Sequence, residues 1–384
     1  MGAPVLGSSD VQLRRDRTSV KWVAFAPDVL PLWVAEMDAD PCPAVVDAVT
    51  AAVRRGDTGY AWGPRYAAAV ARYASATWGW EVDTSAAMIV PDVMIGAAEL
   101  LRLLTDDGGP IIVSPPVYDA FFGFVEAIGR RRVDAPLDAT GRLAPQVLAS
   151  AFGAATARGE RAAYLLCNPQ NPTGTVHSAE ELATLAALAE EHGVRVVADE
   201  IHAPIVYAGG PAFTPYLTVP GAERGFSVFS PSKGWNLAGL KSGLAMAGPG
   251  AVDDLRRLHE VHTHGSSHVG SIAHIAAMDD GREWLAQLLS ELDRNRALLG
   301  RLLTEHLPMV RWRPQDATFL AWLDCRELGL GDDPAAAFHA RGRVALGSGP
   351  TYGPVDGKGY ARLNLATSPA IVTEAVRRMA SVVG

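Results

Sequence analysis

Between residues 85 and 250, short apolar runs alternate with longer stretches of helical periodicity. Four runs have the length and the side chains of strands: 111–114, 162–166, 194–198 and 226–229. A helix between the second and third runs opens with Ser178 and Glu181 in capping-box spacing and carries leucines on one face. Because strands separated by helices need right-handed crossovers, this pattern predicts a largely parallel sheet covered by helices on both faces.

After residue 280 the pattern changes to one long helix over 283–303, then strands near 318–323 and 360–366, and a last helix after Ser368 and Pro369. Strands and helices gathered in this way predict a smaller α+β domain. The first forty residues have no strong periodicity, and we assign them to this smaller domain. The expected division is a large domain at 42–280 and a small domain made of 1–41 with 281–384.

Polar side chains follow three of the predicted strands: Asn168, Asp199 and Ser230. In an open α/β sheet, ligands bind beyond the carboxyl ends of the strands, so these side chains are expected near a ligand. Each segment alone has an ordinary explanation, such as turn chemistry for Asn168-Pro-Gln-Asn-Pro-Thr-Gly174. A strand followed by Asp-Glu is also found in P-loop ATPases, but the G-x-x-x-x-G-K-[ST] phosphate loop is absent from the sequence.

Composition restricts the partners and the compartment. The chain has 384 residues and a formal charge of -8, from 34 basic and 42 acidic side chains, which argues against a nucleic-acid partner. It shows neither a signal-peptide pattern at its start nor an apolar stretch of about 20 residues, so we expect a cytoplasmic protein without a membrane partner. Three scattered cysteines suggest neither a disulfide framework nor a cysteine metal site.

Lysine is rare, since Lys21, Lys233, Lys241 and Lys358 are the only four among 34 basic residues. Any chemistry that needs a lysine therefore has a short list of candidates. Lys233 stands in Ser230-Pro-Ser-Lys233, directly after a predicted strand. A solvated loop lysine is the ordinary interpretation, but this position makes it a poor one here.

Taken together and in this order, four segments resemble a known family. They are Asn168-Pro-Gln-Asn-Pro-Thr-Gly174, Asp199-Glu-Ile-His202, Ser230-Pro-Ser-Lys233, and Lys241 eight residues further on. The chain is similar to the fold-type-I enzymes that use pyridoxal 5'-phosphate (PLP), in the class I/II aminotransferase superfamily. Within it the chain resembles the MalY/PatB branch of cystathionine β-lyases. The likeness extends from Trp33-Val-Ala-Glu-Met-Asp38 to Arg362-Leu-Asn364.

The resemblance implies roles for five residues around the cofactor ring. Lys233 holds PLP as an imine and, once released, moves the proton from the substrate Cα, which requires its neutral amine. We expect burial and a neighbouring cation, for which Lys241 is a candidate, to favour that form. Asp199 pairs with the protonated ring nitrogen, Asn171 bonds the phenolic oxygen, Tyr118 stacks on the ring, and His202 lies near the ring oxygen. A buried histidine with satisfied hydrogen bonds is the other interpretation of His202.

The cofactor phosphate needs its own donors. We expect the backbone amides at a helix start after Met88-Ile-Val-Pro to be unpaired and to point at the anion: Val93, Met94 and Ile95. By resemblance, Ser230 adds a hydroxyl and Lys241 adds a positive charge. Asp92 departs from this picture, because a carboxylate beside a phosphate is unfavourable unless it faces away.

The resemblance also identifies substrate contacts. Arg362 is expected to bind the α-carboxylate of an amino acid with two parallel donors. Trp33 and Ala35, in the N-terminal motif, are expected to line the same site. Tyr60, in Thr58-Gly-Tyr-Ala-Trp, is similar to a tyrosine that reaches the active site of the partner subunit, which implies a homodimer with shared sites.

The reaction that the resemblance implies is α,β-elimination from cystathionine or a related cysteine conjugate. Two departures fall near the substrate, Glu36 where relatives usually carry Asp and Ala39 where they usually carry Phe. Transamination shares the early steps and stays open as an alternative. So does a PLP-binding regulatory protein with incidental catalysis, although neither a helix-turn-helix segment nor a basic tail is apparent.

Five of the ten histidines lie between His259 and His274, which raises the question of a zinc site. The pair His259 and His262 is one residue short of the H-E-x-x-H spacing. We therefore expect no metal, and polar lining near a dimer interface instead.

Overall fold

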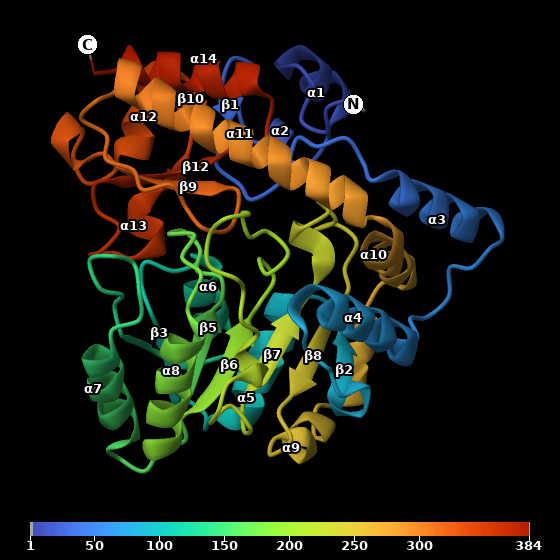
Figure 1. Cartoon of the computed structure of the whole chain (residues 1–384). Helices are drawn as coiled ribbons and strands as arrows, with labels where there is room; N and C mark the ends of the chain where they lie inside the picture. Colours follow the sequence, from blue (N-terminus) through green and yellow to red (C-terminus); the bar gives the residue numbers. More distant parts are fainter. Residues whose placement is uncertain (1–2, 384) are drawn as a thin grey trace.

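A computed structural model describes residues 3–383 and contains a seven-stranded sheet with helices on both faces (Figure 1). Its order is β2-β8-β7-β6-β5-β3-β4, with β3 to β7 parallel and β8 antiparallel to both neighbours. All four strands predicted in this region are present, and the largely parallel sheet is confirmed. The strands are β2 (Ala87–Val90), β3 (Pro110–Val113), β4 (Arg131–Asp134), β5 (Ala163–Cys167), β6 (Arg195–Asp199), β7 (Phe226–Phe229) and β8 (Gly243–Ala247).

Alternate residues of the sheet pack into two separate cores, as the pleat of a strand requires. One face packs against α5 (Val93–Leu104), α6 (Ala120–Ala127) and α9 (Val252–Arg256). The other packs against α7 (Pro145–Thr156) and α8 (Ala179–Glu191), and towards β8 and β2 against α4 (Gly63–Trp78) and α10 (His268–Asp280). The predicted capping box of α8 is present, with Ser178 and Glu181 each accepting a backbone amide hydrogen bond.

A second, three-stranded antiparallel sheet has the order β11-β12-β9. It packs with the C-terminal helices, which Figure 1 shows in orange and red above the large sheet. β1 pairs in parallel with β10, so the N-terminal segment lies with these elements as expected, while the exact domain bounds stay a prediction. The elements are β1 (Leu30–Pro31), β9 (Leu320–Asp324), β10 (Val344–Ala345), β11 (Gly347–Ser348), β12 (Tyr360–Asn364), α1 (Asp10–Asp16), α2 (Val20–Val23), α11 (Arg282–His306), α12 (Pro334–Gly342), α13 (Gly349–Tyr352) and α14 (Pro369–Ala380).

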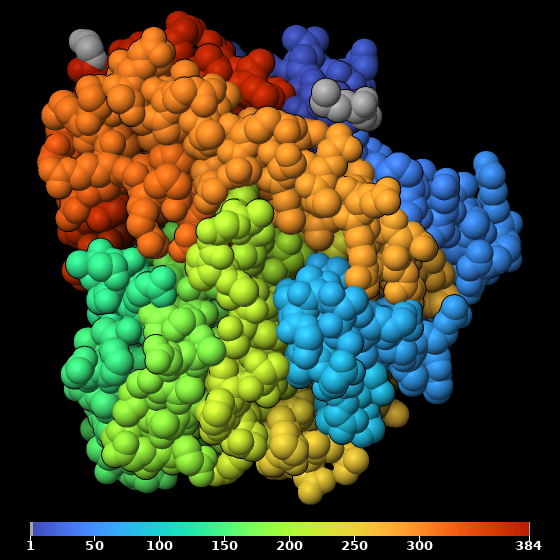
Figure 2. Space-filling model, in the orientation of Figure 1, coloured from blue at the N-terminus to red at the C-terminus, as the bar shows by residue number. Residues whose placement is uncertain are grey.

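The C-terminal elements cap one end of the large sheet, and α3 (Pro43–Arg54) projects to the side (Figure 2). Five short 3-10 helices complete the described chain: η1 (Thr84–Ala86), η2 (Tyr216–Thr218), η3 (Pro231–Lys233), η4 (Glu260–Gly265) and η5 (Arg326–Leu328). Within residues 3–383, no helix has the length and apolar character needed to cross a membrane.

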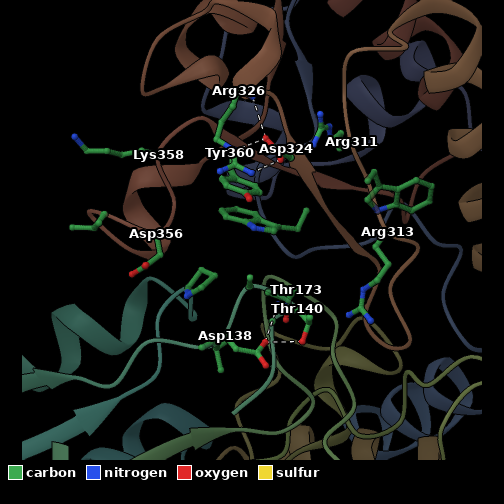
Figure 3. Close-up of a pocket in the computed structure, with 17 residues that line it drawn as sticks. Asp138, Thr140, Thr173, Arg311, Arg313, Asp324, Arg326, Asp356, Lys358 and Tyr360 are labelled. Carbon is green, nitrogen blue, oxygen red and sulfur yellow. Dashed lines mark hydrogen bonds and ion pairs between the residues drawn. The ribbon is translucent and has the colours of Figure 1, made fainter. Parts of the chain in front are cut away.

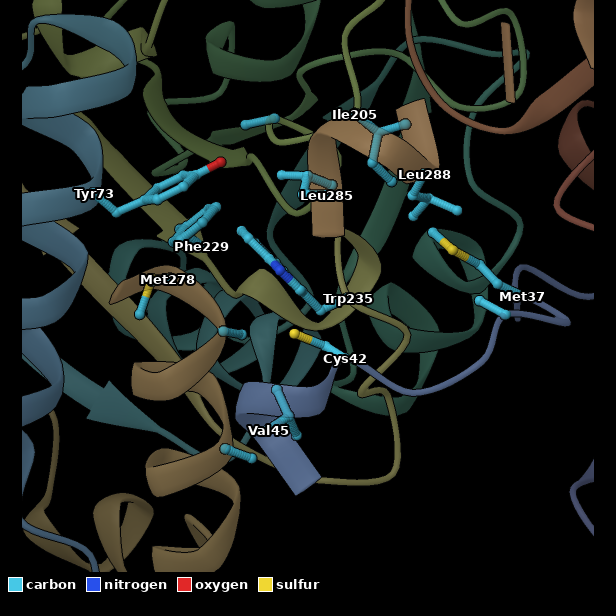
Figure 4. Packing of buried hydrophobic residues seen from close by; sticks show 14 of the residues in the cluster. Met37, Cys42, Val45, Tyr73, Ile205, Phe229, Trp235, Met278, Leu285 and Leu288 are labelled. Carbon is cyan, nitrogen blue, oxygen red and sulfur yellow. The ribbon is translucent and has the colours of Figure 1, made fainter. Parts of the chain in front are cut away.

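One hydrophobic cluster joins the two sheets next to the predicted site (Figure 4). Trp235, two residues after Lys233, is 1% exposed, and its indole donates to the carbonyl of Gly281 at 3.0 Å. Met37 and Cys42 from the N-terminal segment belong to the same cluster. Close packing of this kind leaves little freedom to the backbone on either side of Lys233.

Candidate active site

Asn168, Asp199 and Ser230 lie at the carboxyl ends of the neighbouring parallel strands β5, β6 and β7, at one edge of the large sheet. β6 ends at Asp199, and β7 leads through Ser230 into η3, whose last residue is Lys233. Asn171 follows β5 and contacts Arg362 of β12, with Arg362 Nη1 donating to Asn171 Oδ1 at 3.1 Å. The site is therefore built from the edge of the large sheet on one side and from the small sheet on the other.

Lys233 is partly buried, and its Nζ donates to the carbonyl of Ala35 at 2.7 Å. Desolvation lowers the pKa of this amine to about 8, and the positive charge of Arg362 lowers it further than that of Lys241 does. Lys241, the candidate for the neighbouring cation, also lowers this pKa, but Arg362 has the larger effect. The amine of Lys241 is itself paired with Asp92. Because the pKa is lowered, a larger fraction of the amine is neutral at physiological pH than for an ordinary lysine.

Asp199 is buried, and one oxygen of its carboxylate accepts the amide of Ile201 at 3.1 Å. Burial raises the pKa of this carboxyl to about 7, against a smaller lowering by the Ile201 amide and by Lys233. A buried carboxylate with a single amide donor is poorly compensated. It fits a cationic partner such as a protonated pyridine nitrogen, which would favour the charged form.

We expect Asp199→Asn to stabilise the cofactor-free protein at neutral pH. Between about pH 4 and 7 the folded wild type keeps a proton that the unfolded chain has lost, so its stability falls as pH rises through this window. Asparagine removes this cost, which is on the order of 1.4 kcal/mol per pKa unit. Urea unfolding at several pH values measures it. If the difference in unfolding free energy between the variant and the wild type is the same at pH 4 and at pH 8, the prediction is contradicted.

Arg362 is 4% exposed and is held from three sides. Besides the contact with Asn171, its Nη2 donates to the carbonyl of Trp33 at 2.8 Å, and its guanidinium lies 4.6 Å from the ring centroid of Tyr352. Its Nε is buried and has no hydrogen-bond partner within residues 3–383. A fixed guanidinium with a free donor can receive a substrate carboxylate.

The charge of Arg362 acts on both His202 and Tyr118. His202 is buried, its Nδ1 has no partner in the described chain, and burial followed by the charges of Lys233 and Arg362 holds its pKa well below the usual range. Burial raises the pKa of Tyr118 to about 12. Both side chains are therefore neutral at pH 7. The unpartnered nitrogens of His202 and Arg362, with the carboxylate of Asp199, fit a polar cofactor such as PLP.

The helix start expected to hold the phosphate is only partly free. Val93 and Met94 lie in the first turn of α5, where no carbonyl is available to their amides. The amide of Ile95 is not free, because it donates to Asp92 Oδ1 at 2.8 Å, so the expectation that it is unpaired was wrong. Asp92 is the N-cap of the helix, a role that was not predicted from the sequence.

Lys241 and Ser230 are also engaged. Lys241 Nζ lies 2.9 Å from the second oxygen of Asp92, and its side chain is 56% exposed. The hydroxyl of Ser230 donates to the carbonyl of Ser242 at 2.9 Å and accepts the amide of Ser232. Both oxygens of the Asp92 carboxylate are occupied, one by the Ile95 amide and one by Lys241. Phosphate binding by these residues stays a prediction.

The contacts of Tyr60 are with other residues. It is 88% exposed, bridges to Ser267, and lies beside His264 with ring centroids 6.2 Å apart. With Trp62 and Met88 it lines a surface cavity of about 660 Å³. Its expected role concerns a partner subunit and is not tested within one chain.

The histidines of residues 259–274 are dispersed among different partners. His268 contacts Asp57 at 2.8 Å, His262 lies 3.5 Å from Glu99, and buried His274 contacts Tyr66. Among the residues described, no three His, Cys, Asp or Glu side chains gather in a way that could hold a metal ion.

A larger cavity, of about 770 Å³, lies beside the site and not at it (Figure 3). Trp322 and Tyr360 form one wall, stacked 5.1 Å apart, and Asp138 and Thr140 lie opposite. Trp322 is the direct cross-strand partner of Arg362, so the cavity and the guanidinium share one face of the small sheet. Lys233 does not line the cavity.

Sequence reasoning missed two residues next to the site. Asn236 exchanges hydrogen bonds with the backbone of Met37, at 2.9 Å each, and Lys21 is fully buried beside Asp38. A signal for Lys21 was present, because it is one of four lysines and follows Ser19 and Val20 in a segment with little periodicity.

The chain is similar to known proteins over most of its length. The family model Aminotransferase class I and II matches residues 27–379. The "Putative cystathionine beta-lyase" of Mycobacterium tuberculosis is 51% identical, over 96% of this chain and 95% of its own. The cystathionine beta-lyase of Corynebacterium glutamicum is 32% identical, over 96% and 97%. A solved "putative PLP-dependent beta-cystathionase" of Corynebacterium diphtheriae has a TM-score of 0.90 at 34% identity, with 98% of each chain covered.

Proposed function

Because the chain belongs to the aminotransferase class I and II family, we propose that it is a PLP-dependent carbon–sulfur β-lyase. It cleaves cystathionine, or a related cysteine S-conjugate, into a thiol, pyruvate and ammonia. The relative that is 51% identical is named "Putative cystathionine beta-lyase" and the one that is 32% identical is named "Cystathionine beta-lyase", which favours elimination over transamination.

One observation carries the proposal: the amine of Lys233 contacts the Ala35 carbonyl and is acted on by the charges that its chemistry needs. Arg362 lowers the pKa of this amine, and Asp199 acts in the opposite direction. PLP, when bound, supplies a ring that withdraws electrons from the substrate Cα. Asp199 is proposed to keep the ring nitrogen protonated, and Asn171, Tyr118 and His202 are proposed to surround the ring.

The protein side chains then have distinct tasks in the elimination. Arg362 binds the α-carboxylate and so fixes the orientation of the Cα–H bond. The neutral amine of Lys233 takes the Cα proton. The Cβ–S bond breaks as sulfur leaves with the electron pair and is protonated to the thiol, and water converts the remaining fragment to pyruvate and ammonia. The contacts of Trp33 and Ala35 place the N-terminal segment over this site.

We expect Asp92→Asn to tighten cofactor binding. Asparagine can still accept the Ile95 amide, but it removes a carboxylate from the proposed phosphate site and releases Lys241 from its ion pair. Cofactor release should become roughly 10-fold slower, given the strength of charge–charge interactions at a few ångströms. Loss of visible cofactor absorbance during repeated dilution measures the rate, with exposed Asp253→Asn as the control. Unchanged or faster release would contradict the prediction.

The same proposal includes a homodimer in the cytoplasm. Tyr60 and Trp62 are 88% and 66% exposed on one loop, and large apolar side chains exposed together favour an interface. Tyr60 is proposed to enter the site of the partner subunit there. Cys42, Cys167 and Cys325 are free and buried, as is usual in a reducing compartment.

The proposed function is tested by incubating the PLP-loaded protein with cystathionine and measuring pyruvate and free thiol without any keto acid. Steady release of both in equal amounts supports the lyase. Strict dependence on an added keto acid would instead indicate an aminotransferase, and negligible turnover on a panel of cysteine conjugates would leave the regulatory alternative.

A further inference from the structure

Residues 33–38 form a segment, called the strap below, whose carbonyls are all held from Trp33 to Met37. Two of the donors are the proposed catalytic groups: Arg362 bonds the Trp33 carbonyl and Lys233 bonds the Ala35 carbonyl. Asn364 bonds the carbonyls of Val34 and Glu36 at 2.8 and 2.7 Å, and Asn236 bonds Met37. The strap therefore links the small sheet, the large sheet and Lys233.

A second set of contacts comes from residues 19–22, called the clamp below. Lys21 Nζ donates to the Glu36 carbonyl at 3.0 Å and lies 2.8 Å from Asp38 Oδ2. The indole of Trp22 donates to the other oxygen of Asp38 at 2.8 Å. The hydroxyl of Ser19 donates to the carboxylate of Glu36. Ser19 thus holds the side chain of Glu36, and Lys21 and Trp22 together hold the side chain of Asp38.

Burial in the clamp is the reverse of what hydrophobicity predicts. Lys21 is 0% exposed, whereas Val20 and Val23 in the same short helix are 54% and 62% exposed. Burying an ammonium and a carboxylate carries a desolvation penalty, and a well-packed apolar pair is often at least as stable. Stability alone is therefore a weak explanation for this ion pair. The directed contacts to the strap provide a better one.

We infer that Lys21 is a positioning residue, which fixes the strap so that the Trp33 carbonyl holds Arg362 and the Ala35 carbonyl holds the amine of Lys233 whenever that amine is free. The inference rests on the proposed function and deepens it. Without Lys21, the Glu36 peptide and the Asp38 side chain lose a shared anchor, and Asn364 alone then holds the Glu36 carbonyl next to Ala35. Misplacement of a reacting group by about 1 Å can cost about 100-fold in rate.

The clamp also determines where the charge of Glu36 lies. Glu36 acts on the amine of Lys233 in the direction opposite to Arg362, together with Asp199, while Lys241 adds a smaller effect with the sign of Arg362. A strap that moves would change this balance. A change in the pH dependence of turnover is therefore expected from a positioning role and not from a general loss of stability.

The test uses the PLP-loaded enzyme and cystathionine. Lys21→Met removes the ammonium at similar length but leaves Asp38 buried and unpaired, so Lys21→Met/Asp38→Asn is made as well. In the double variant we expect kcat to fall about 10- to 100-fold and its pH profile to shift. Cofactor content and melting temperature should stay close to wild type. Trp22→Phe and Ser19→Ala, each removing one clamp hydrogen bond, should give smaller changes of the same kind.

The exposed, ion-paired Lys358 provides the control, since Lys358→Met should change neither kcat nor the pH profile. If wild type is active but the double and single clamp variants keep its kcat and pH profile, the inference is overturned. It is equally overturned if activity falls only in proportion to lost cofactor or folded protein. If wild type shows no elimination, the proposed function itself has failed, which is a distinguishable result.

Discussion

Lys233→Ala is expected to lower kcat for pyruvate release from cystathionine by about 1000-fold or more. A positioned base contributes about 100- to 10,000-fold, and the variant also loses the covalent attachment of the cofactor. No other described lysine can replace it. Lys21 is buried in the clamp, Lys241 is paired with Asp92, and Lys358 is paired with Asp332. Steady-state kinetics at saturating PLP measures the loss.

Lys358→Ala is the matched control for this prediction, because it removes a lysine from an exposed ion pair and should leave kcat unchanged. Lys233→Arg adds a second comparison, since it keeps a positive charge but cannot act as a base near neutral pH. Activity of Lys233→Ala within 10-fold of wild type would show that another group moves the proton.

Arg362→Lys is expected to lower kcat/KM by about 100-fold, mainly through KM. Lysine keeps the charge that acts on Lys233, but it loses the planar donor pair and the simultaneous contacts with Asn171 and Trp33. Arg362→Leu removes the charge as well, so its loss should be larger. It should also allow the pKa of Lys233 to rise, which moves the acidic limb of the pH profile to higher pH.

Exposed Arg377 on α14, paired with Glu374, provides the control, and Arg377→Lys should behave as wild type. Initial rates over a range of cystathionine concentrations and pH separate the two effects. Should Arg362→Lys retain full kcat/KM, the substrate carboxylate binds elsewhere.

The sequence was sufficient for the parts of the fold that have strong periodicity. β6 and β7, which lead to Asp199 and Ser230, are largely apolar and buried apart from Arg195, and they were predicted at nearly their observed bounds. β4 was missed because it is an edge strand whose residues Arg131–Asp134 are largely charged. β8 was missed because glycine and alanine fill much of Gly243–Ala247, and small side chains carry a weak strand signal.

The candidate site shows the same division. Strand ends identified Asp199 and Lys233, since the edge of a parallel sheet places such residues together. The pairing of Asp92 with Lys241, and the greater effect of Arg362 on Lys233, depend on side chains that meet only after the two sheets pack. Contacts between residues about 130 to 330 positions apart, such as that of Arg362 with Trp33, leave no periodic trace in the sequence.

The strap connects Lys233 and Arg362, which are far apart in the sequence. The proposed base and the proposed carboxylate ligand do not rest only on their own strands, because both donate to carbonyls of the N-terminal segment. That segment is in turn held by Lys21 and by Asn236. The N-terminal residues thus belong to the site, although in the sequence they are the least regular part of the chain.

The measurement that tests the central claim most directly is reduction of the PLP-loaded protein with borohydride, followed by digestion and mass spectrometry of the peptides. Because the chain has only four lysines, the outcome is unambiguous. We predict that the reduced cofactor is found on the peptide that contains Lys233 and on no other. Cofactor fixed to Lys21, Lys241 or Lys358, or fixed equally to a Lys233→Ala protein, would contradict the account.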